Sequence, residues 1–322
     1  MNTVYKKAAA GEAHGKLILT GEHAVVYGKP AIGIPFPLKA RSIVKGCSGN
    51  IMFKSAIYTG DVNSVPKKMN GILECIKETL HYLDRPFEGI QIEIDSEIPI
   101  GRGLGSSAAI STAIVRSLFS FYGQKLSQEE LFTFVNIAET FAHGEPSGID
   151  MAAVTSKAPI WFQKEKDTVQ LKLVKPLYMI VADTGRIGDT RSAVENVKRK
   201  YSVEPEKIRS SLNKIEKIAG EAKAAILNGN VYLLGKLLDA NQKELVTLGV
   251  SDNELNELIE AARNAGALGS KLTGGGLGGC IIALGKSLEN AKVIAEDLMK
   301  AGASKSWYFS TDEDILYVSE VN

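Results

Sequence analysis

The order of strand-like and helix-like segments predicts an α+β protein with two domains. Short apolar segments separated by Gly or Pro, typical of strands, fill residues 1–60, and helical patterns alternate with strands after them. Helical spacing dominates residues 189–263, and a mixed pattern returns towards the end of the chain. At 322 residues, the chain has the length of about two domains. We therefore place a boundary near residue 175, between domains 1–175 and 176–322.

The individual elements follow from periodicity. Isoleucines alternate with polar residues over Ile90–Ile98, which predicts a half-buried strand that Pro99 ends. Ser127, with Glu130 three residues later, predicts a capped helix over residues 128–142. The same reasoning predicts helices over 67–82, 106–122 and 288–301, and strands over 16–20, 31–36, 40–45, 50–58, 158–163, 169–174, 177–183, 278–284, 305–310 and 315–318.

Composition excludes several classes of function. A formal net charge of +1 gives no field that would favour nucleic acid or an anionic membrane. No apolar segment approaches the roughly 20 residues that cross a bilayer, and the first residues lack the apolar core of a signal peptide. Cysteines and histidines show neither C-x-x-C nor H-E-x-x-H spacing, which argues against a disulfide framework and a zinc site. We expect a cytoplasmic protein that acts on a small molecule, without nucleic-acid or membrane partners.

The segment Pro99–Ala109 (PIGRGLGSSAA) joins the predicted strand to the predicted helix. Its glycines allow tight turns and close approach of a ligand, and the helix offers unpaired N–H groups at the positive end of its dipole. These features predict an anion site suited to a polyphosphate, with two serine hydroxyls beside it. The pattern matches neither G-x-x-x-x-G-K-[ST] nor G-x-G-x-x-G, so it is not a P-loop or a dinucleotide fingerprint. An ordinary glycine-rich turn is the structural alternative.

Three further segments contain charged or glycine-rich clusters. In Lys16–Pro30, Lys16 precedes an apolar strand and Glu22–His23 follow a glycine; taken alone, a solvated strand end and a polar loop explain them better. In Glu139–Asp150, a carboxylate at a helix end and another beyond a Gly/Pro turn could hold Mg²⁺ and act as a base. Equally, Glu139 could be a surface residue and Asp150 an N-cap. Lys271–Gly279 (KLTGGGLGG) marks a loop where backbone approaches backbone or a ligand.

Taken together and in this order, these segments resemble the motifs of the GHMP kinases, which include galactokinase, homoserine kinase, mevalonate kinase and phosphomevalonate kinase. The motifs GEHAVVYG, GLGSSAA, HGEPSGID and TGGGLGGC look most like the mevalonate kinase branch, and they occupy Gly21–Gly28, Gly103–Ala109, His143–Asp150 and Thr273–Cys280. The resemblance implies an N-terminal domain like a ribosomal-protein α+β domain, a ferredoxin-like C-terminal domain and an active site in the cleft between them.

The resemblance also implies a role for each matching residue. Asp150 would be the base on the substrate hydroxyl, with Lys16 close to it. Ser107 and Glu139 would hold Mg²⁺. Glu22, His23 and Thr190 would shape the substrate pocket, and Arg191 is a candidate for binding a substrate carboxylate. The ATP phosphates would be bound by the loop residues Gly101, Gly103, Leu104, Gly105, Ser106 and Ser107.

The expected reaction is ATP-dependent phosphorylation of the primary hydroxyl of mevalonate, giving 5-phosphomevalonate. Two alternatives stay open: a related kinase acting on homoserine, a sugar or phosphomevalonate, and a sensor on the same fold that binds without catalysis. One departure is visible, because Ile100 and Arg102 are larger than the residues that relatives often have there. A homodimer is compatible with the family, but no feature of the sequence decides it.

Overall fold

The computed structural model describes residues 7–144, 146–312 and 318–321. By their contacts, the residues form two compact units. Unit 1 contains residues 1–15, 38–99 and 105–155, and unit 2 contains residues 16–37, 100–104 and 156–322. Strands β1 (Ala8–Thr20) and β2 (Ala31–Asn50) each contribute residues to both units. The two units are described separately below.

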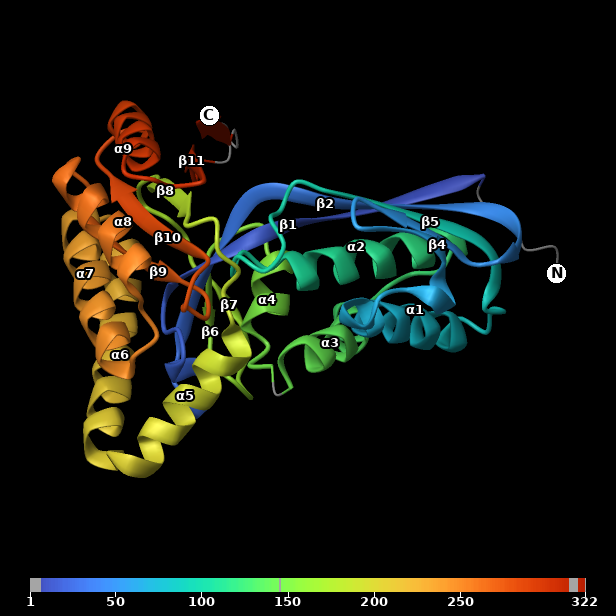
Figure 1. Ribbon diagram of the computed structural model, residues 1–322, viewed down its shortest axis with the longest axis horizontal. Helices are drawn as coiled ribbons and strands as arrows, with labels where there is room; N and C mark the ends of the chain where they lie inside the picture. Colours follow the sequence, from blue (N-terminus) through green and yellow to red (C-terminus); the bar gives the residue numbers. More distant parts are fainter. Residues whose placement is uncertain (1–6, 145, 313–317, 322) are drawn as a thin grey trace. The chain divides into compact units, whose positions relative to one another are not determined.

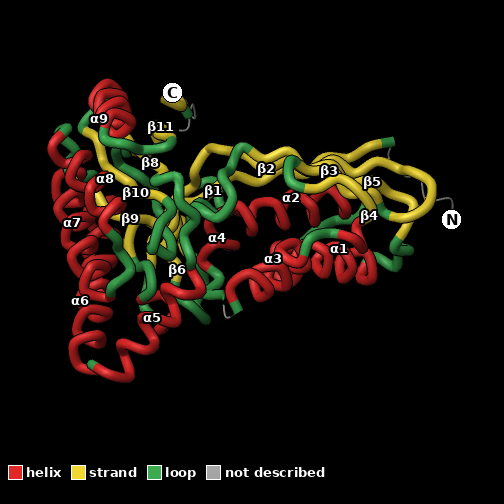
Figure 2. Tube along the Cα trace, in the orientation of Figure 1, coloured by secondary structure: helices red, strands yellow, loops and turns green. Residues whose placement is uncertain are grey.

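In unit 1, one layer of strands lies against one layer of helices (Figures 1 and 2). The strand order is β4-β3-β5-β2, where β5 (Glu88–Ser96) pairs antiparallel with β2 and parallel with β3. Helices α1, α2 and α3 pack against one another, and α4 packs against α2 and α3. The remaining elements of this unit have the bounds β3 Met52–Ser55, β4 Tyr58–Asp61, α1 Asn70–Tyr82, α2 Ser106–Phe121, α3 Gln128–His143 and α4 Ile149–Thr155, with short 3-10 turns at Val62–Ser64 and Lys67–Met69.

In unit 2, a five-stranded antiparallel sheet has the order β12-β11-β8-β10-β9. Helices α8 and α9 pack on this sheet, α7 packs along β9, and α6 packs on α7 (Figure 1). The first residues of β2 pair with β6, which pairs with β7. The bounds are β6 Ile160–Phe162, β7 Val169–Gln170, β8 Tyr178–Asp183, α5 Thr190–Val203, α6 Pro205–Leu227, α7 Val231–Leu248, α8 Asn253–Asn264, β9 Gly269–Thr273, β10 Cys280–Gly285, α9 Leu288–Lys300, β11 Lys305–Ser310 and β12 Ser319–Val321, with a 3-10 turn at Ala24–Tyr27.

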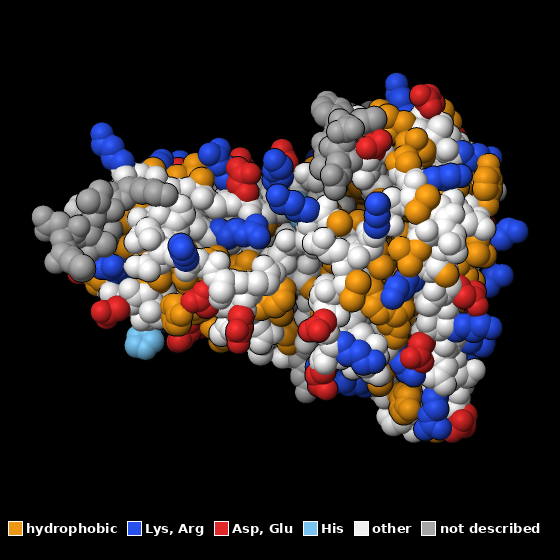
Figure 3. All heavy atoms as spheres, turned by 180° about the vertical axis from the view of Figure 1, so that it is seen from behind, with side chains coloured by type: hydrophobic (Ala, Val, Ile, Leu, Met, Phe, Trp, Pro, Cys, Tyr) orange, Lys and Arg blue, Asp and Glu red, His pale blue; other side chains and the backbone are white. Residues whose placement is uncertain are grey.

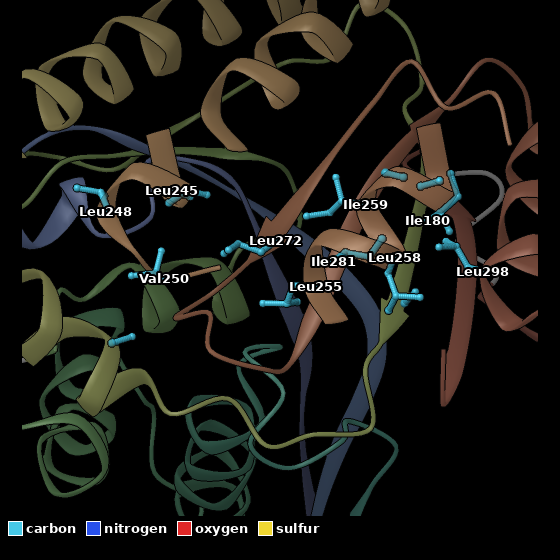
Figure 4. Close-up of a cluster of buried hydrophobic side chains, with 14 of the residues drawn as sticks. Ile180, Leu245, Leu248, Val250, Leu255, Leu258, Ile259, Leu272, Ile281 and Leu298 are labelled. Carbon is cyan, nitrogen blue, oxygen red and sulfur yellow. The ribbon is translucent and has the colours of Figure 1, made fainter. Parts of the chain in front are cut away.

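A cluster of buried aliphatic side chains forms the core of unit 2. Figure 4 shows Leu255, Leu258 and Ile259 of α8 in one buried cluster with Leu272 of β9 and Ile281 of β10. Leu298 of α9 and Ile180 of β8 extend the cluster, and Leu245, Leu248 and Val250 lie at its α7 end. The apolar faces of the helices are thus buried against the sheet, which fixes the strand ends from which the glycine-rich loops leave.

Many of the predicted elements are confirmed. Strand β5 ends at Ser96, and its Ile90 and Ile92 are buried as the alternation predicts. Helix α3 begins with the predicted capping box, in which the Ser127 side chain accepts from the Glu130 N–H and the Glu130 carboxylate accepts from the Ser127 N–H. The helix-rich stretch after residue 189 contains α5 to α8.

Several elements differ from the prediction. The predicted strand 50–58 is divided between β3 and β4, which pair antiparallel. Strand β1 begins at Ala8 instead of residue 16, because the inward-facing residues Ala9, Gly11 and Ala13 are small enough to pack closely. A Cβ on Gly11 would lie 2.3 Å from the Ala113 carbonyl of α2. The predicted strands 31–36 and 40–45 are one strand, whose prolines at 35 and 37 fall between the residues that pair with β6 and those that pair with β5. Of the predicted strand 169–174, only Val169–Gln170 forms. Residues 315–317 of the predicted strand 315–318 lie outside the described residues.

The surface carries both signs of charge. On the face shown in Figure 3, basic and acidic side chains are interspersed, in keeping with the net charge of +1. No helix among the described residues has the length and apolar character needed to cross a bilayer. The domain boundary near residue 175 stays a prediction.

Two helical glycines of unit 2 provide a matched test of the packing. A Cβ on Gly235 of α7 would lie 2.4 Å from the Leu268 carbonyl, so Gly235→Ala should destabilise the protein by about 1–3 kcal/mol. A Cβ on Gly220 of α6 would meet nothing within 4 Å, so Gly220→Ala should be neutral or gain up to about 1 kcal/mol from helix propensity. Denaturant unfolding followed by tryptophan fluorescence measures both, because Trp161 and Trp307 lie in unit 2. Equal effects would contradict this packing.

Candidate functional site

Lys16 lies in unit 2 and is 2% exposed, so it is not the solvated strand end that the sequence alone favoured. Its backbone N–H donates to the Leu104 carbonyl at 2.9 Å. This bond attaches Leu104, in the middle of the predicted phosphate loop, to strand β1. The structure therefore brings together Lys16 and Leu104, which the sequence places far apart.

Glu22 forms a buried ion pair with Lys271 of β9. Both side chains are at most 1% exposed, and the Lys271 Nζ donates to Glu22 Oε1 and to the Ile18 and Leu272 carbonyls. Burial raises the pKa of Glu22, while the charge of Lys271 and, more weakly, that of Lys16 oppose the rise. Burial also lowers the pKa of Lys271, which Glu22 opposes. The pair thus joins the turn after β1 to the strand that precedes the glycine-rich loop.

His23 follows Glu22 and is held by the same glycine-rich loop. Its φ of 60° is left-handed, and its Nε2 lies 2.8 Å from the Gly275 carbonyl. A carbonyl oxygen only accepts, so Nε2 carries the proton and Nδ1 is the acceptor of the ring. Burial lowers the pKa of His23 to about 4, so the imidazole is neutral at physiological pH.

Thr190 and Arg191 form the first turn of α5, which Asp189 caps by accepting from the Ser192 N–H. Thr190 lies against the glycine-rich loop, since a Cβ on Gly275 would be 2.5 Å from the Thr190 Oγ1. Arg191 is exposed. Unit 2 therefore gathers Glu22, His23 and Thr190 around Lys271 and Gly275, whereas Arg191 faces solvent at the start of α5.

The first part of the predicted phosphate loop, Ile100–Leu104, belongs to unit 2 and packs backbone against backbone. Gly101 and Gly103 have φ values of 72° and 76°, which favour glycine. A Cβ on Gly274 would lie 2.9 Å from the Gly103 Cα, and the Gly188 N–H donates to the Gly101 carbonyl at 2.8 Å. The two glycine-rich segments singled out in the sequence thus touch, and glycine is required for that contact.

The second part of the loop, Gly105–Ser107, belongs to unit 1 and starts α2. Gly105 is the N-cap with φ 78°, and no side chain caps the helix. Ser106 is buried and its hydroxyl donates to the Ile98 carbonyl at 3.4 Å, while Ser107 is partly exposed. The first-turn N–H groups and the Ser107 hydroxyl are therefore the groups suited to a phosphate or a cation.

Glu139 and Asp150 also lie in unit 1, on α3 and α4. Glu139 is 2% exposed, so it is not a surface residue. Asp150 lies within the first turn of α4 instead of capping it, after Gly148 with φ 89°, and it is partly exposed. Ser107, Glu139 and Asp150 are thus carried by α2, α3 and α4, which pack against one another. Glu145, within the same motif, lies outside the described residues.

Two residues of this region were missed by sequence reasoning. Lys271 was noted only as the start of a glycine-rich segment, and Asp183 as the end of a strand. A lysine in a short segment with no other charged residue was the available signal for Lys271, but its partner lies 249 residues away. The Asp183 carboxylate binds Arg102, 81 residues earlier. No local pattern specifies such pairs.

Comparison with known proteins agrees with this geometry. The family descriptions "GHMP kinases N terminal domain" and "GHMP kinases C terminal" match residues 69–157 and 222–304. A mevalonate kinase of Pyrococcus furiosus is 34% identical over 294 residues, covering 84% of this chain and 87% of that protein. One of Thermococcus onnurineus is 32% identical over 325 residues, covering 94% and 96%.

The chain belongs to the mevalonate kinase family of GHMP kinases.

Solved structures of the family share its fold. The Methanococcus jannaschii mevalonate kinase has a TM-score of 0.79 at 26% identity, with all of both chains covered. The L. major mevalonate kinase, solved in complex with R-mevalonate, has a TM-score of 0.83 at 24% identity, covering 95% of this chain and 98% of that one. The predicted α+β GHMP kinase fold is confirmed. As a kinase of this family, the protein uses ATP as a substrate.

The Glu22–Lys271 pair can be tested by removing one charge. Lys271→Met leaves a buried carboxylate without its cation and should lower the free energy of unfolding by about 3–5 kcal/mol. Adding Glu22→Gln should restore much of that loss. The control is Lys29→Met, which breaks a partly exposed pair with Glu216 and should cost less than about 1 kcal/mol. Denaturant unfolding that shows equal, small losses for Lys271→Met and Lys29→Met would contradict the buried pair.

The low pKa of His23 predicts a pH dependence of stability. Between pH 6.5 and about 4, the unfolded chain binds a proton that the folded His23 excludes, so the free energy of unfolding falls as the pH falls. The loss due to His23 should reach about 3 kcal/mol near pH 4. His23→Gln should lack this part of the loss when both proteins are unfolded in denaturant at pH 7 and pH 4. Parallel losses in the two proteins would show that His23 titrates normally.

Proposed function

We propose that the protein transfers the γ-phosphoryl group of ATP to the primary hydroxyl of mevalonate. One observation carries this proposal. Lys16, Glu22 and His23 of one segment and Thr190 of another gather in unit 2 around Lys271 and the glycine-rich loop that also contacts the predicted phosphate loop. The sequence similarity to mevalonate kinases supports mevalonate over the other alcohols of the superfamily.

In this proposal, Lys16 stabilises charge and Asp150 removes the proton. Phosphoryl transfer demands mainly positioning and stabilisation of charge on the phosphate oxygens. The Lys16 ammonium stabilises that charge and lowers the pKa of the attacking hydroxyl. Asp150, in the first turn of α4, orients the hydroxyl and takes its proton. Burial of Lys16 strengthens its electrostatic effect, because the local dielectric is low.

Substrate recognition falls to residues of unit 2. His23 is neutral, so it recognises the substrate through hydrogen bonding, with Nδ1 accepting from a hydroxyl of mevalonate. Thr190 adds a hydroxyl beside the same loop. Mevalonate also carries a carboxylate, for which Arg191 supplies an exposed guanidinium at the positive end of α5.

We include Mg²⁺ in the proposal because the donor set fits it. Ser107 and Glu139 supply a hydroxyl and a carboxylate oxygen from packed helices, and oxygen ligands are those that Mg²⁺ takes. When bound, the ion neutralises charge on the ATP phosphates. The predicted phosphate contacts would come from the first-turn N–H groups of α2 and from the loop before it.

The proposal also includes a cytoplasmic location. All three cysteines are free thiols, two of them buried, which suits the cytoplasm. The homodimer stays a prediction.

An assay of ATP consumption tests the reaction. Purified protein with Mg²⁺ and a panel of mevalonate, phosphomevalonate, homoserine and galactose should consume ATP with mevalonate, at a kcat/KM at least tenfold above that of any other alcohol. Preference for another alcohol would replace mevalonate as the substrate. ATP binding without turnover on any alcohol would favour the sensor alternative.

Asp150 is tested by substitution. Asp150→Ala should lower kcat by about 10²–10⁴-fold, because base catalysis contributes that much, while ATP binding survives. The control is Asp95→Ala, which removes an exposed carboxylate from β5 of the same unit and should keep wild-type kcat. Near-normal turnover in Asp150→Ala would remove Asp150 from the mechanism.

A further inference from the structure

Arg102 is one of the two loop residues that the sequence singles out as unusually large, and its side chain is bound within unit 2. The Arg102 Nε donates to Asp183 Oδ2 at 2.9 Å, and Nη2 donates to the Gly185 carbonyl at 2.8 Å. The side chains of Arg102 and Asp183 are 17% and 4% exposed. A charge-assisted pair with so little solvent contact is stronger than a surface pair, which solvent and salt screen.

Asp183 provides a rigid anchor for this arginine. It is the last residue of β8, whose backbone pairs with Cys280 of β10 on one side and Lys305 of β11 on the other. Its other carboxylate oxygen, Oδ1, accepts from the Gly185 N–H at 2.8 Å, and its carbonyl accepts from the Ser304 N–H at 2.8 Å. The sheet of unit 2 therefore fixes the position of the Asp183 carboxylate, and this carboxylate in turn fixes the position of the Arg102 guanidinium.

The backbone around Arg102 needs such an anchor. Gly101 and Gly103 flank it, and glycine loses more conformational freedom on ordering than any other residue. The other fixed points of Ile100–Leu104 include the Gly101 carbonyl bound to Gly188, the close contact of Gly103 with Gly274, and the buried Leu104, whose carbonyl accepts from the Lys16 N–H. Arg102 therefore supplies the polar side-chain bonds that hold the middle of this short loop.

We propose that Arg102 is a positioning residue for ATP binding: its bonds to Asp183 and Gly185 keep Ile100–Leu104 in the phosphate-binding conformation before the nucleotide arrives. The inference rests on the proposed function, because it assigns the loop to the ATP phosphates. Arg102 itself acts through the loop backbone and contacts no reacting atom. Its loss lowers the fraction of molecules in the competent conformation, and the apparent dissociation constant rises in inverse proportion to that fraction.

The test compares Arg102→Ala and Arg102→Lys with Arg186→Ala. Arg186 is a nearby arginine whose side chain forms exposed ion pairs with Asp252 and Glu254, so it is the control. Titration calorimetry with ATP and Mg²⁺, without an alcohol, should show an about tenfold higher Kd for Arg102→Ala, which corresponds to a competent fraction of about one tenth. The Kd of Arg102→Lys should lie between those of the wild type and Arg102→Ala, because lysine keeps the charge but not the forked geometry. Arg186→Ala should bind as the wild type does.

Steady-state kinetics separates positioning from general damage. For Arg102→Ala we expect KM for ATP to rise about tenfold, with KM for mevalonate unchanged, kcat within about threefold and the thermal midpoint within a few degrees of the wild type. If Arg102→Ala fails to fold, Arg102→Ala combined with Asp183→Asn removes the uncompensated buried charge and should show the same change in Kd.

Three outcomes overturn the inference: an unchanged Kd for ATP in Arg102→Ala, a rise of both KM values together with a lower thermal midpoint, or an equal effect in Arg186→Ala. Failure of the wild type to phosphorylate any alcohol would contradict the proposed function but not this inference, because the calorimetric comparison still decides it. Failure of the wild type to bind ATP would contradict both the proposed function and this inference.

Discussion

A single buried ion pair connects the parts of unit 2 to which we assign substrate recognition. Lys271 lies on β9 and Glu22 on the turn that follows β1, and neither side chain has more than 1% of its surface exposed. Charges buried to this degree are stable only with excellent geometry, so each fixes the position of the other. The turn that carries His23 and the strand that leads to Gly275 are thereby held together, and the His23–Gly275 hydrogen bond follows from that arrangement.

The glycines of the two loops near this pair allow close backbone packing, and the same lack of side chains leaves backbone exposed for binding. The phosphate loop and the glycine-rich loop approach so closely that a Cβ on Gly274 would collide with Gly103. Removing side chains at these positions lets the two backbones pack, and it also leaves N–H groups unobstructed for phosphate oxygens. The structural and functional explanations of these glycines, which are rivals at the level of sequence, are therefore compatible.

The elements that could be predicted from the sequence are those that depend on local patterns. The alternation over Ile90–Ile98 and the Ser127–Glu130 capping box depend on neighbouring residues, and both elements form as predicted. The continuity of β2 through two prolines and the early start of β1 at Ala8 depend on partners elsewhere in the chain, so propensity alone missed them. The motifs located Lys16, Glu22, His23 and Thr190. Lys271 and Asp183, the partners of Glu22 and Arg102, become visible only once the sheet of unit 2 is assembled.

The ionisation state of Glu22 is the most direct test of this account. Infrared difference spectroscopy of the wild type against Glu22→Gln at neutral pH isolates the vibration of this one side chain. We expect the band of an ionised carboxylate, perturbed by its contact with an ammonium, to disappear in the variant. A protonated carboxyl band in the wild type would mean that Glu22 is neutral, and the ion pair on which the arrangement of the site depends would not exist.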